Sequence, residues 1–122
     1  MVTNFEFHTK DISIEDLKNV DPLIDILSKP NKETKFLTPK LVVLLNVYND
    51  DDRPKVNGRK IRKLVNYIRT KGISPIIATS GGYYISKDPK EIKKQIVSLI
   101  ERASSINSCA DGLLKYLVDN KL

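Results

Sequence analysis

The 122-residue sequence has one cysteine, one histidine, one methionine and no tryptophan. A single cysteine, Cys109, excludes an internal disulfide framework and is typical of a reducing cytoplasm. There is no run of about 18 apolar residues, which excludes a membrane span. Residues 1–6 have neither a basic start nor an apolar run, so no secretory signal is expected. The length suits one domain and is short for two. The sequence therefore predicts a cytoplasmic globular protein.

Groups that perform chemistry are scarce. His8 lies near the amino terminus, and neither His8 nor Cys109 has a partner at a spacing that suits nucleophilic catalysis or zinc binding. Cys109 lies beside an apolar helical seam, where a small buried residue is the simpler interpretation. The run Asp50–Asp52 lacks the glycine and terminal glutamate of a calcium loop, and an exposed connection explains it better than Mg²⁺ binding. We therefore expect no enzymatic activity, no metal site and no cofactor.

The net charge of +6 is unevenly distributed. Residues 1–52 carry six Lys or Arg and ten Asp or Glu, and residues 53–94 carry twelve basic and two acidic residues. Residues 95–122 carry three of each. A basic excess confined to one segment is typical of a surface that binds a polyanion, although a solvated lysine-rich face is the alternative.

Helix signals begin soon after the amino terminus. Ser13 precedes an acid at the capping-box spacing, and Asp21-Pro22 is a second start signal. The pattern over residues 14–28 fits either one kinked helix or two short ones. Thr38-Pro39 repeats the cap-then-proline signal, and the apolar residues after it predict a helix ending near Tyr48.

Residues 57–71 form the clearest predicted element. Gly72 suits a left-handed cap after it. One apolar stripe recurs at helical spacing and consists of Ile61, Leu64, Val65 and Ile68. At about 100° per residue, the opposite side carries Arg59, Lys63, Asn66 and Thr70, with Arg62, Tyr67 and Arg69 on the flanks. A helix with this division suits the major groove of DNA, where Arg pairs with guanine, Asn with adenine and Lys with phosphate.

A β-hairpin is predicted next. Residues 75–79 and 83–85 are β-prone and flank Ser80-Gly81-Gly82. Tyr83 and Tyr84 should point to opposite faces of the second strand, one toward the core and the other toward a phosphate.

Asp88-Pro89 opens a last helix, whose one weak point is Gly112. Its apolar residues alternate spacings of four and three over more than three heptads, which is typical of a coiled-coil seam. This seam would be buried against a second copy of the chain or against residues 14–28 of the same chain. It consists of Ile92, Ile96, Leu99, Ala103, Ile106, Ala110, Leu113 and Leu117.

Residues 56–72, together with Pro75-Ile76-Ile77 and residues 80–85, resemble the recognition helix and wing of winged helix-turn-helix proteins. The pattern is similar in particular to a group encoded by bacteriophages and mobile elements. In that group the recognition helix ends in a turn of the pattern R-x-x-G-x-P-I, which is followed by S-x-G-Y-Y. Ser104–Ile106 and Ala110–Leu113 also resemble that group, and the resemblance covers about residues 20–115.

This resemblance implies an α+β, mostly helical fold: three helices plus a β-hairpin wing, followed by a long C-terminal helix. By it, residues 22–28 form the first helix and Thr38–Val47 the helix stacked on the recognition helix. The connection Asn49–Lys55 departs from the family, because it is longer than the usual turn of about three or four residues. The expected organisation is an extension over residues 1–19, a winged helix-turn-helix over 20–86 and a dimerising helix over 88–122.

The sequence thus predicts a homodimer that binds double-stranded DNA in a bacterial host cell. It would act as a phage-type transcriptional regulator or replication accessory protein. Arg59, Lys63 and Asn66 would contact the major groove, and the hairpin tip a neighbouring groove. The predicted contact residues are Lys55, Asn57, Arg59, Lys60, Arg62, Lys63, Asn66, Tyr67, Arg69, Thr79, Ser80, Gly81 and Gly82.

Two alternatives stay open at this point. The basic face could bind an acidic host or phage protein, for example as an inhibitor, because a fold does not fix a function. It could also bind double-stranded RNA by shape.

Overall fold

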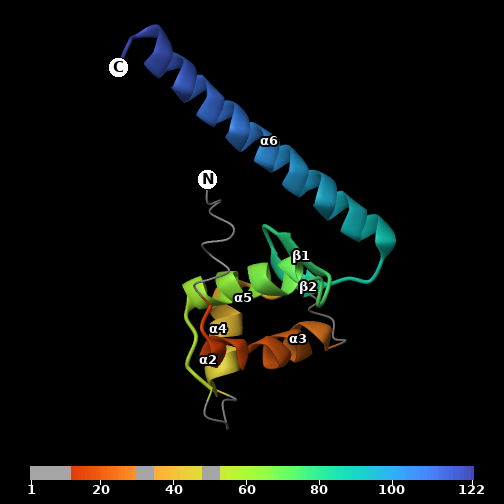
Figure 1. Cartoon of the computed structure of the whole chain (residues 1–122). Coiled ribbons are helices and arrows are strands. Elements are labelled where there is room, and N and C mark those ends of the chain that lie inside the picture. The colour runs from red at the N-terminus through yellow and green to blue at the C-terminus, as the bar shows by residue number, and fades with distance from the viewer. Residues whose placement is uncertain (1–11, 30–34, 48–52) are drawn as a thin grey trace. The chain divides into compact units, whose positions relative to one another are not determined.

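The computed structural model describes residues 12–29, 35–47 and 53–122. They form an α+β structure that is mostly helical, with a hairpin of two antiparallel strands and a long C-terminal helix (Figure 1). The chain divides into two compact units, Met1–Lys87 and Asp88–Leu122. The elements are α2 (Ile14–Leu17), α3 (Val20–Ser28), α4 (Thr38–Val47), α5 (Gly58–Thr70), β1 (Ile76–Thr79), β2 (Gly82–Ile85) and α6 (Pro89–Asp119).

Residues 14–28 form two short helices rather than one kinked helix. The Ser13 hydroxyl accepts a hydrogen bond from the Asp16 backbone N–H at 3.1 Å, which confirms the predicted cap of α2. The predicted start at Asp21-Pro22 is wrong. Helix α3 begins at Val20, and the first helical hydrogen bond runs from the Leu23 N–H to the Asn19 carbonyl.

Helix α4 covers the predicted residues 38–47, with Leu41 and Leu45 buried. Its first hydrogen bond joins the Leu41 N–H to the Leu37 carbonyl at 3.1 Å. Thr38 is therefore the first helical residue and not the cap that precedes the helix. Tyr48 lies outside the described residues.

Helix α5 confirms the clearest prediction from the sequence. The Asn57 side chain caps its first turn by accepting a hydrogen bond from the Lys60 N–H at 2.9 Å. At the other end, Gly72 has a φ of 65°, and the Ile73 N–H bonds the Ile68 carbonyl, as in a Schellman cap. The predicted apolar stripe is at most 3% exposed and consists of Ile61, Leu64, Val65 and Ile68.

The predicted hairpin forms, but its bounds differ from the prediction: β1 begins at Ile76, and Gly82 belongs to β2, where it pairs with Thr79. Only Ser80-Gly81 lie between the strands. Phe36 extends it by a β-bridge, because the Phe36 and Tyr83 backbones exchange two hydrogen bonds of 2.8 Å. Tyr83 packs against the core. The ring of Tyr84 lies under Lys35, whose Nζ is 5.8 Å from the ring centroid.

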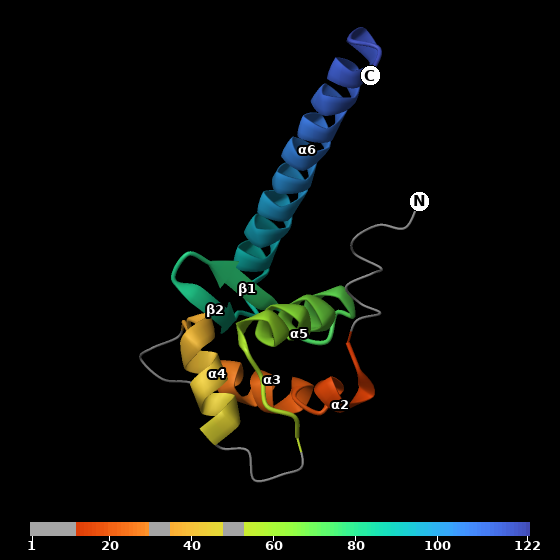
Figure 2. The ribbon, with the colours of Figure 1, turned by 90° about the vertical axis from the view of Figure 1, so that its left-hand side faces the viewer.

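One core holds the first unit together. Helix α5 contacts α2, α4 and β1, and α3 contacts α4 and β2. Figure 2 shows α5 on one level, α2 and α3 on the level below, and α4 at one end. The side chains in the centre that are almost fully buried are Leu23, Leu41, Leu45, Ile61, Leu64 and Ile68. Burial of these side chains is the main stabilising contribution to this unit.

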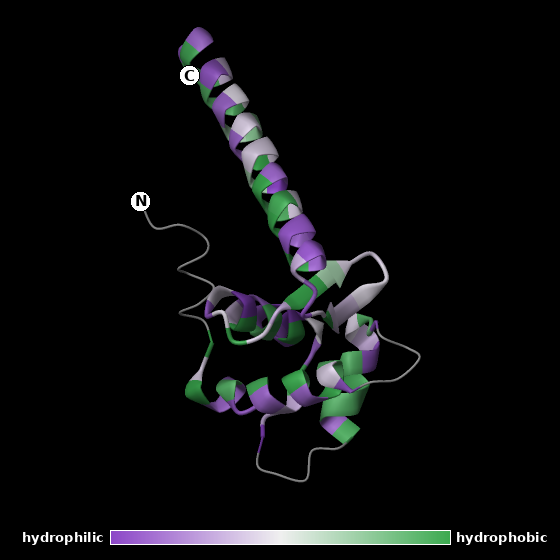
Figure 3. Cartoon of the chain, turned by 90° about the vertical axis from the view of Figure 1, so that its right-hand side faces the viewer, coloured by the Kyte–Doolittle hydropathy of each residue, from purple (hydrophilic) through white to green (hydrophobic). Residues whose placement is uncertain are grey.

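The second unit is the 31-residue helix α6. Asp88 caps it as predicted, since its carboxylate accepts a hydrogen bond from the Lys90 N–H at 3.0 Å. The helix continues through Gly112. Apolar and polar residues alternate along it (Figure 3). Cys109 is exposed, which contradicts the burial expected from its place beside the seam. Of the helices in the described part of the chain, none is long and apolar enough to cross a membrane.

Candidate nucleic-acid interface

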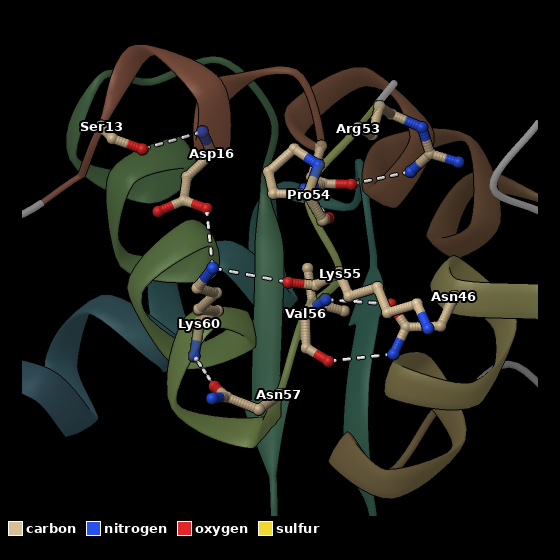
Figure 4. Close-up of polar contacts among 10 residues, drawn as sticks. Ser13, Asp16, Asn46, Arg53, Pro54, Lys55, Val56, Asn57 and Lys60 are labelled. Atoms are coloured by element: carbon tan, nitrogen blue, oxygen red, sulfur yellow. Dashed lines mark hydrogen bonds and ion pairs between the residues drawn. The ribbon is translucent and has the colours of Figure 1, made fainter. Parts of the chain in front are cut away.

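Two asparagines, Asn19 and Asn46, hold the segment that leads into α5; Figure 4 shows Asn46 beside Val56. Asn46 of α4 donates a hydrogen bond to the Val56 carbonyl and accepts one from the Val56 N–H, both at 2.9 Å. Asn19 is buried, with an exposed fraction of 1%; its side chain donates to the Pro54 carbonyl at 3.1 Å and accepts from Arg53 at 2.7 Å. The start of α5 is therefore fixed to both α3 and α4. The long connection predicted at Asn49–Lys55 lies partly outside the described residues.

We expect Asn46→Ala to lower the free energy of unfolding by about 2 kcal/mol, because both backbone groups of the buried Val56 lose their partner. Urea unfolding followed by circular dichroism measures this change. The matched control is Val47→Ala, the next residue of α4, whose side chain is 66% exposed. Equal unfolding midpoints for the two variants would show that the two Asn46–Val56 hydrogen bonds contribute nothing to stability.

The side of α5 opposite the apolar stripe faces outward, as predicted. Arg59, Arg62 and Thr70 are exposed, while Lys63, Asn66 and Arg69 are half-buried. No acidic residue occurs in α5. We name the outward group the α5 cationic face and define it as Arg59, Arg62, Lys63, Asn66 and Arg69. The face can offer Arg and Lys donors to an anion and an amide to a base edge.

Lys60 has a partner within the protein. Its Nζ lies 3.2 Å from the Asp16 carboxylate of α2 and 3.4 Å from the Lys55 carbonyl. Figure 4 shows this group between α2 and α5. The ion pair joins α2 to the first turn of α5 and so gives Lys60 a structural role that the sequence did not predict. Lys55, also predicted as a contact, is exposed.

Three further residues that were predicted to contact nucleic acid have structural roles in the fold. Asn57 is the cap of α5, and Tyr67 packs against the core cluster. Gly82 is buried, not exposed at the hairpin tip as expected, and has a φ of 119°. A Cβ atom there would lie 2.5 Å from the Phe36 carbonyl oxygen. Glycine at this position therefore serves the close approach of Phe36 to β2, and Gly82 belongs to β2 rather than to the exposed tip of the hairpin.

The rest of the hairpin tip is exposed: Thr79, Ser80 and Gly81. The Thr79 hydroxyl accepts from the Gly81 N–H and donates to the Gly82 carbonyl, each at 3.2 Å, so the side chain of Thr79 orders the turn. A cation that the sequence did not single out lies beside it. The Lys35 Cδ is 3.3 Å from the position of a Cβ on Gly81. The sequence gives no signal for Lys35, because the pairing of the adjacent Phe36 with β2 is seen only in the structure.

The described structure brings α5 and the hairpin into one packed unit, because β1 contacts α5. His8 and Asp50–Asp52, the candidates for catalytic or metal-binding groups, lie outside the described residues. Comparisons of the chain with family models, with curated proteins and with solved structures found no significant match.

Proposed function

We propose that this protein binds double-stranded DNA through a winged helix-turn-helix. Helices α4 and α5 form the helix-turn-helix pair, α5 enters the major groove, and the β1–β2 hairpin is the wing. The observation that carries the proposal is that α5 has a buried apolar side and an outward cationic side. Its apolar stripe is at most 3% exposed, while Arg59, Arg62 and the half-buried Lys63 and Asn66 lie on the other side.

The placement of charge in α5 supports an anionic ligand. Arg59, Lys60 and Arg62 occupy its first turn and a half, and no acid lies there. The N-terminal end of a helix carries partial positive charge, so cations at this end lower helix stability. For Lys60, the Asp16 carboxylate offsets this cost. Phosphate oxygens near Arg59 and Arg62 would relieve the repulsion between these two side chains and the positive end of the helix. Binding of an anion therefore explains two cations that the stability of the helix does not explain.

The chemistry of the α5 cationic face fits a duplex. Arg59 and Lys63 can bind guanine or phosphate, and the Asn66 amide can pair with adenine. Arg62 and Arg69 lie on the flanks, where backbone phosphates run beside a helix seated in the groove. The exposed tip residues and Lys35 supply contacts for an adjacent stretch of backbone. Such a protein suits a role in transcriptional regulation or in replication, of the type encoded by phages.

A titration of fluorescent random-sequence duplex, followed by anisotropy, tests the proposal. We expect binding at 50 mM salt that weakens as salt rises, because the four cations of the α5 cationic face, each neutralising one phosphate, give a log–log slope of about −3.6. Absence of binding at 50 mM salt, or binding that does not respond to salt, would overturn the proposal.

One competition experiment and one capture experiment separate the alternatives from DNA binding. An RNA duplex of the same sequence should compete less well than DNA, because the deep and narrow major groove of RNA does not admit α5. Capture of one acidic protein from nuclease-treated extract, together with no binding to duplex, would favour the protein-interaction function instead.

A further inference from the structure

The apolar seam of α6 is exposed. Five of its six large residues are between 40% and 71% exposed: Ile96, Leu99, Ile106, Leu113 and Leu117. The sixth, Ile92, lies at the start of the helix and is half-buried. Ile100 and Leu114 widen the strip, with exposures of 64% and 60%. A continuous apolar strip of this length on a folded chain marks an interaction surface. We propose that two copies of this chain pair through α6 in antiparallel orientation.

The spacing of the seam argues for a second α6 as the occupant. Its positions alternate by four and three from Ile92 to Leu117, over a length of about 38 Å. A repeat of 3.5 residues keeps apolar positions aligned along such a length only against another supercoiled helix. A helix that covers a globular core crosses it at an angle and uses a period of 3.6. The seam also reaches the three to four heptads that a coiled coil requires.

The sizes of the seam residues argue for the antiparallel orientation. A parallel pair would place Ala103 opposite Ala103 and Ala110 opposite Ala110, which leaves two thin layers with unfilled space. An antiparallel pair centred between Ser104 and Ser105 places Ala103 opposite Ile106 and Ala110 opposite Leu99. A large side chain then faces a small one in each central layer, which is the arrangement that packs without voids.

The same orientation pairs large residues at the ends, with Ile92 opposite Leu117 and Ile96 opposite Leu113. It also separates like charges. Lys90, Lys93 and Lys94 crowd the first turns of α6 with Glu91 as the one acid among them. A parallel pair would place six lysines together, whereas an antiparallel pair puts each group beside the far end of its partner. The helix dipoles then also oppose each other favourably.

Disulfide trapping tests the orientation, because the chain has one cysteine and it is exposed beside the seam. Cys109 directly precedes the seam residue Ala110, and Arg102 directly precedes the seam residue Ala103. The two residues therefore occupy the same position of the heptad repeat, beside the seam. In the antiparallel pair, residue 102 of one copy lies next to residue 109 of the other. Within one helix these two residues are about 10 Å apart along the axis and cannot bond.

We expect Arg102→Cys, with Cys109 retained, to give a covalent dimer under mild oxidation, and peptide mass spectrometry to identify 102–109 links. The wild type and Arg102→Cys/Cys109→Ser, each with one thiol, should remain uncrosslinked. Links of 102 to 102 or 109 to 109 would overturn the antiparallel orientation.

Light scattering of the full chain at about 50 µM tests pairing itself. We expect the mass of a dimer for the wild type and that of a monomer for Leu99→Asp/Ile106→Asp. Because residues 1–87 form a separate compact unit, the circular dichroism of its helices and its DNA binding at saturating protein should persist. The matched control, Lys94→Asp/Lys115→Asp, changes residues on the side away from the seam and should remain dimeric. A monomeric wild type, or a dimeric Leu99→Asp/Ile106→Asp variant, would overturn the pairing whether or not the chain binds DNA.

Discussion

Replacement of both Arg59 and Lys63 by alanine should weaken binding to random duplex DNA about 100-fold at 50 mM salt. Each side chain supplies one charge-assisted hydrogen bond worth about 1.5 kcal/mol, and a loss of about 3 kcal/mol corresponds to two factors of ten. The salt dependence should also become shallower, with a log–log slope smaller by about 1.8 for two lost phosphate contacts. Anisotropy titrations at several salt concentrations measure both quantities.

The control for this experiment removes the same charge elsewhere. Lys94→Ala/Lys115→Ala takes two cations from the side of α6 away from its seam, where both residues are exposed. This variant should lose about threefold in affinity or less, because charges that do not touch the duplex are screened. Equal losses for the two double variants would mean that DNA responds to net charge alone, and the assignment of α5 as the contacting helix would be wrong. Urea unfolding of both variants verifies that they fold.

The sequence predicted α5 well because all its determinants are local. Its cap Asn57, its four-residue apolar stripe and the glycine at its end lie within sixteen residues of one another, and each acts on its neighbours. The same holds for the hairpin and for the start of α6 at Asp88. Local chemistry suffices where caps, turns and periodicity agree.

The start of α3 could not be predicted in this way. Asp21-Pro22 has the local pattern of a helix start, yet the helix begins at Val20. The side chain of Asn19 makes no cap hydrogen bond and instead contacts Pro54 and Arg53, more than 30 residues away. Because Asn19 is buried, these hydrogen bonds satisfy its polar side chain and fix the chain there. Contacts of this sequence separation leave no local signal.

The candidate site shows the same limit. The direction of the α5 cationic face followed from helical periodicity, so the exposure of Arg59 and Arg62 was predicted correctly. The structural role of Lys60 depends on Asp16, and that of Gly82 depends on Phe36; both partners are more than 40 residues distant. The predicted contact residues, chosen from one helix and one turn, therefore include both surface side chains and residues that stabilise the fold. Lys35 was missed because its neighbour in space, the hairpin tip, is also remote in sequence.

Gly82→Ala should destabilise the fold more than Asn46→Ala does, with a loss of about 4 kcal/mol in the free energy of unfolding. At a φ of 119° an alanine is strained by about 1–3 kcal/mol. Its Cβ would also lie 2.5 Å from the Phe36 oxygen and 2.9 Å from the Leu37 nitrogen. These are backbone atoms and cannot rotate away. The two Phe36–Tyr83 hydrogen bonds must therefore lengthen or break, at about 1 kcal/mol each.

Gly81→Ala is the matched control, one residue away in the same turn. Gly81 does not have a positive φ, and its new Cβ would meet only the flexible Lys35 chain at 3.3 Å and the Thr79 hydroxyl at 3.6 Å. We expect a change below about 1 kcal/mol, since alanine loses less backbone entropy than glycine on folding. Thermal and urea unfolding of the two variants should thus differ by several kcal/mol. Similar stabilities would mean that the bridge from Phe36 to β2 is not a strong constraint, and that the hairpin is held to the helices by its apolar side chains alone.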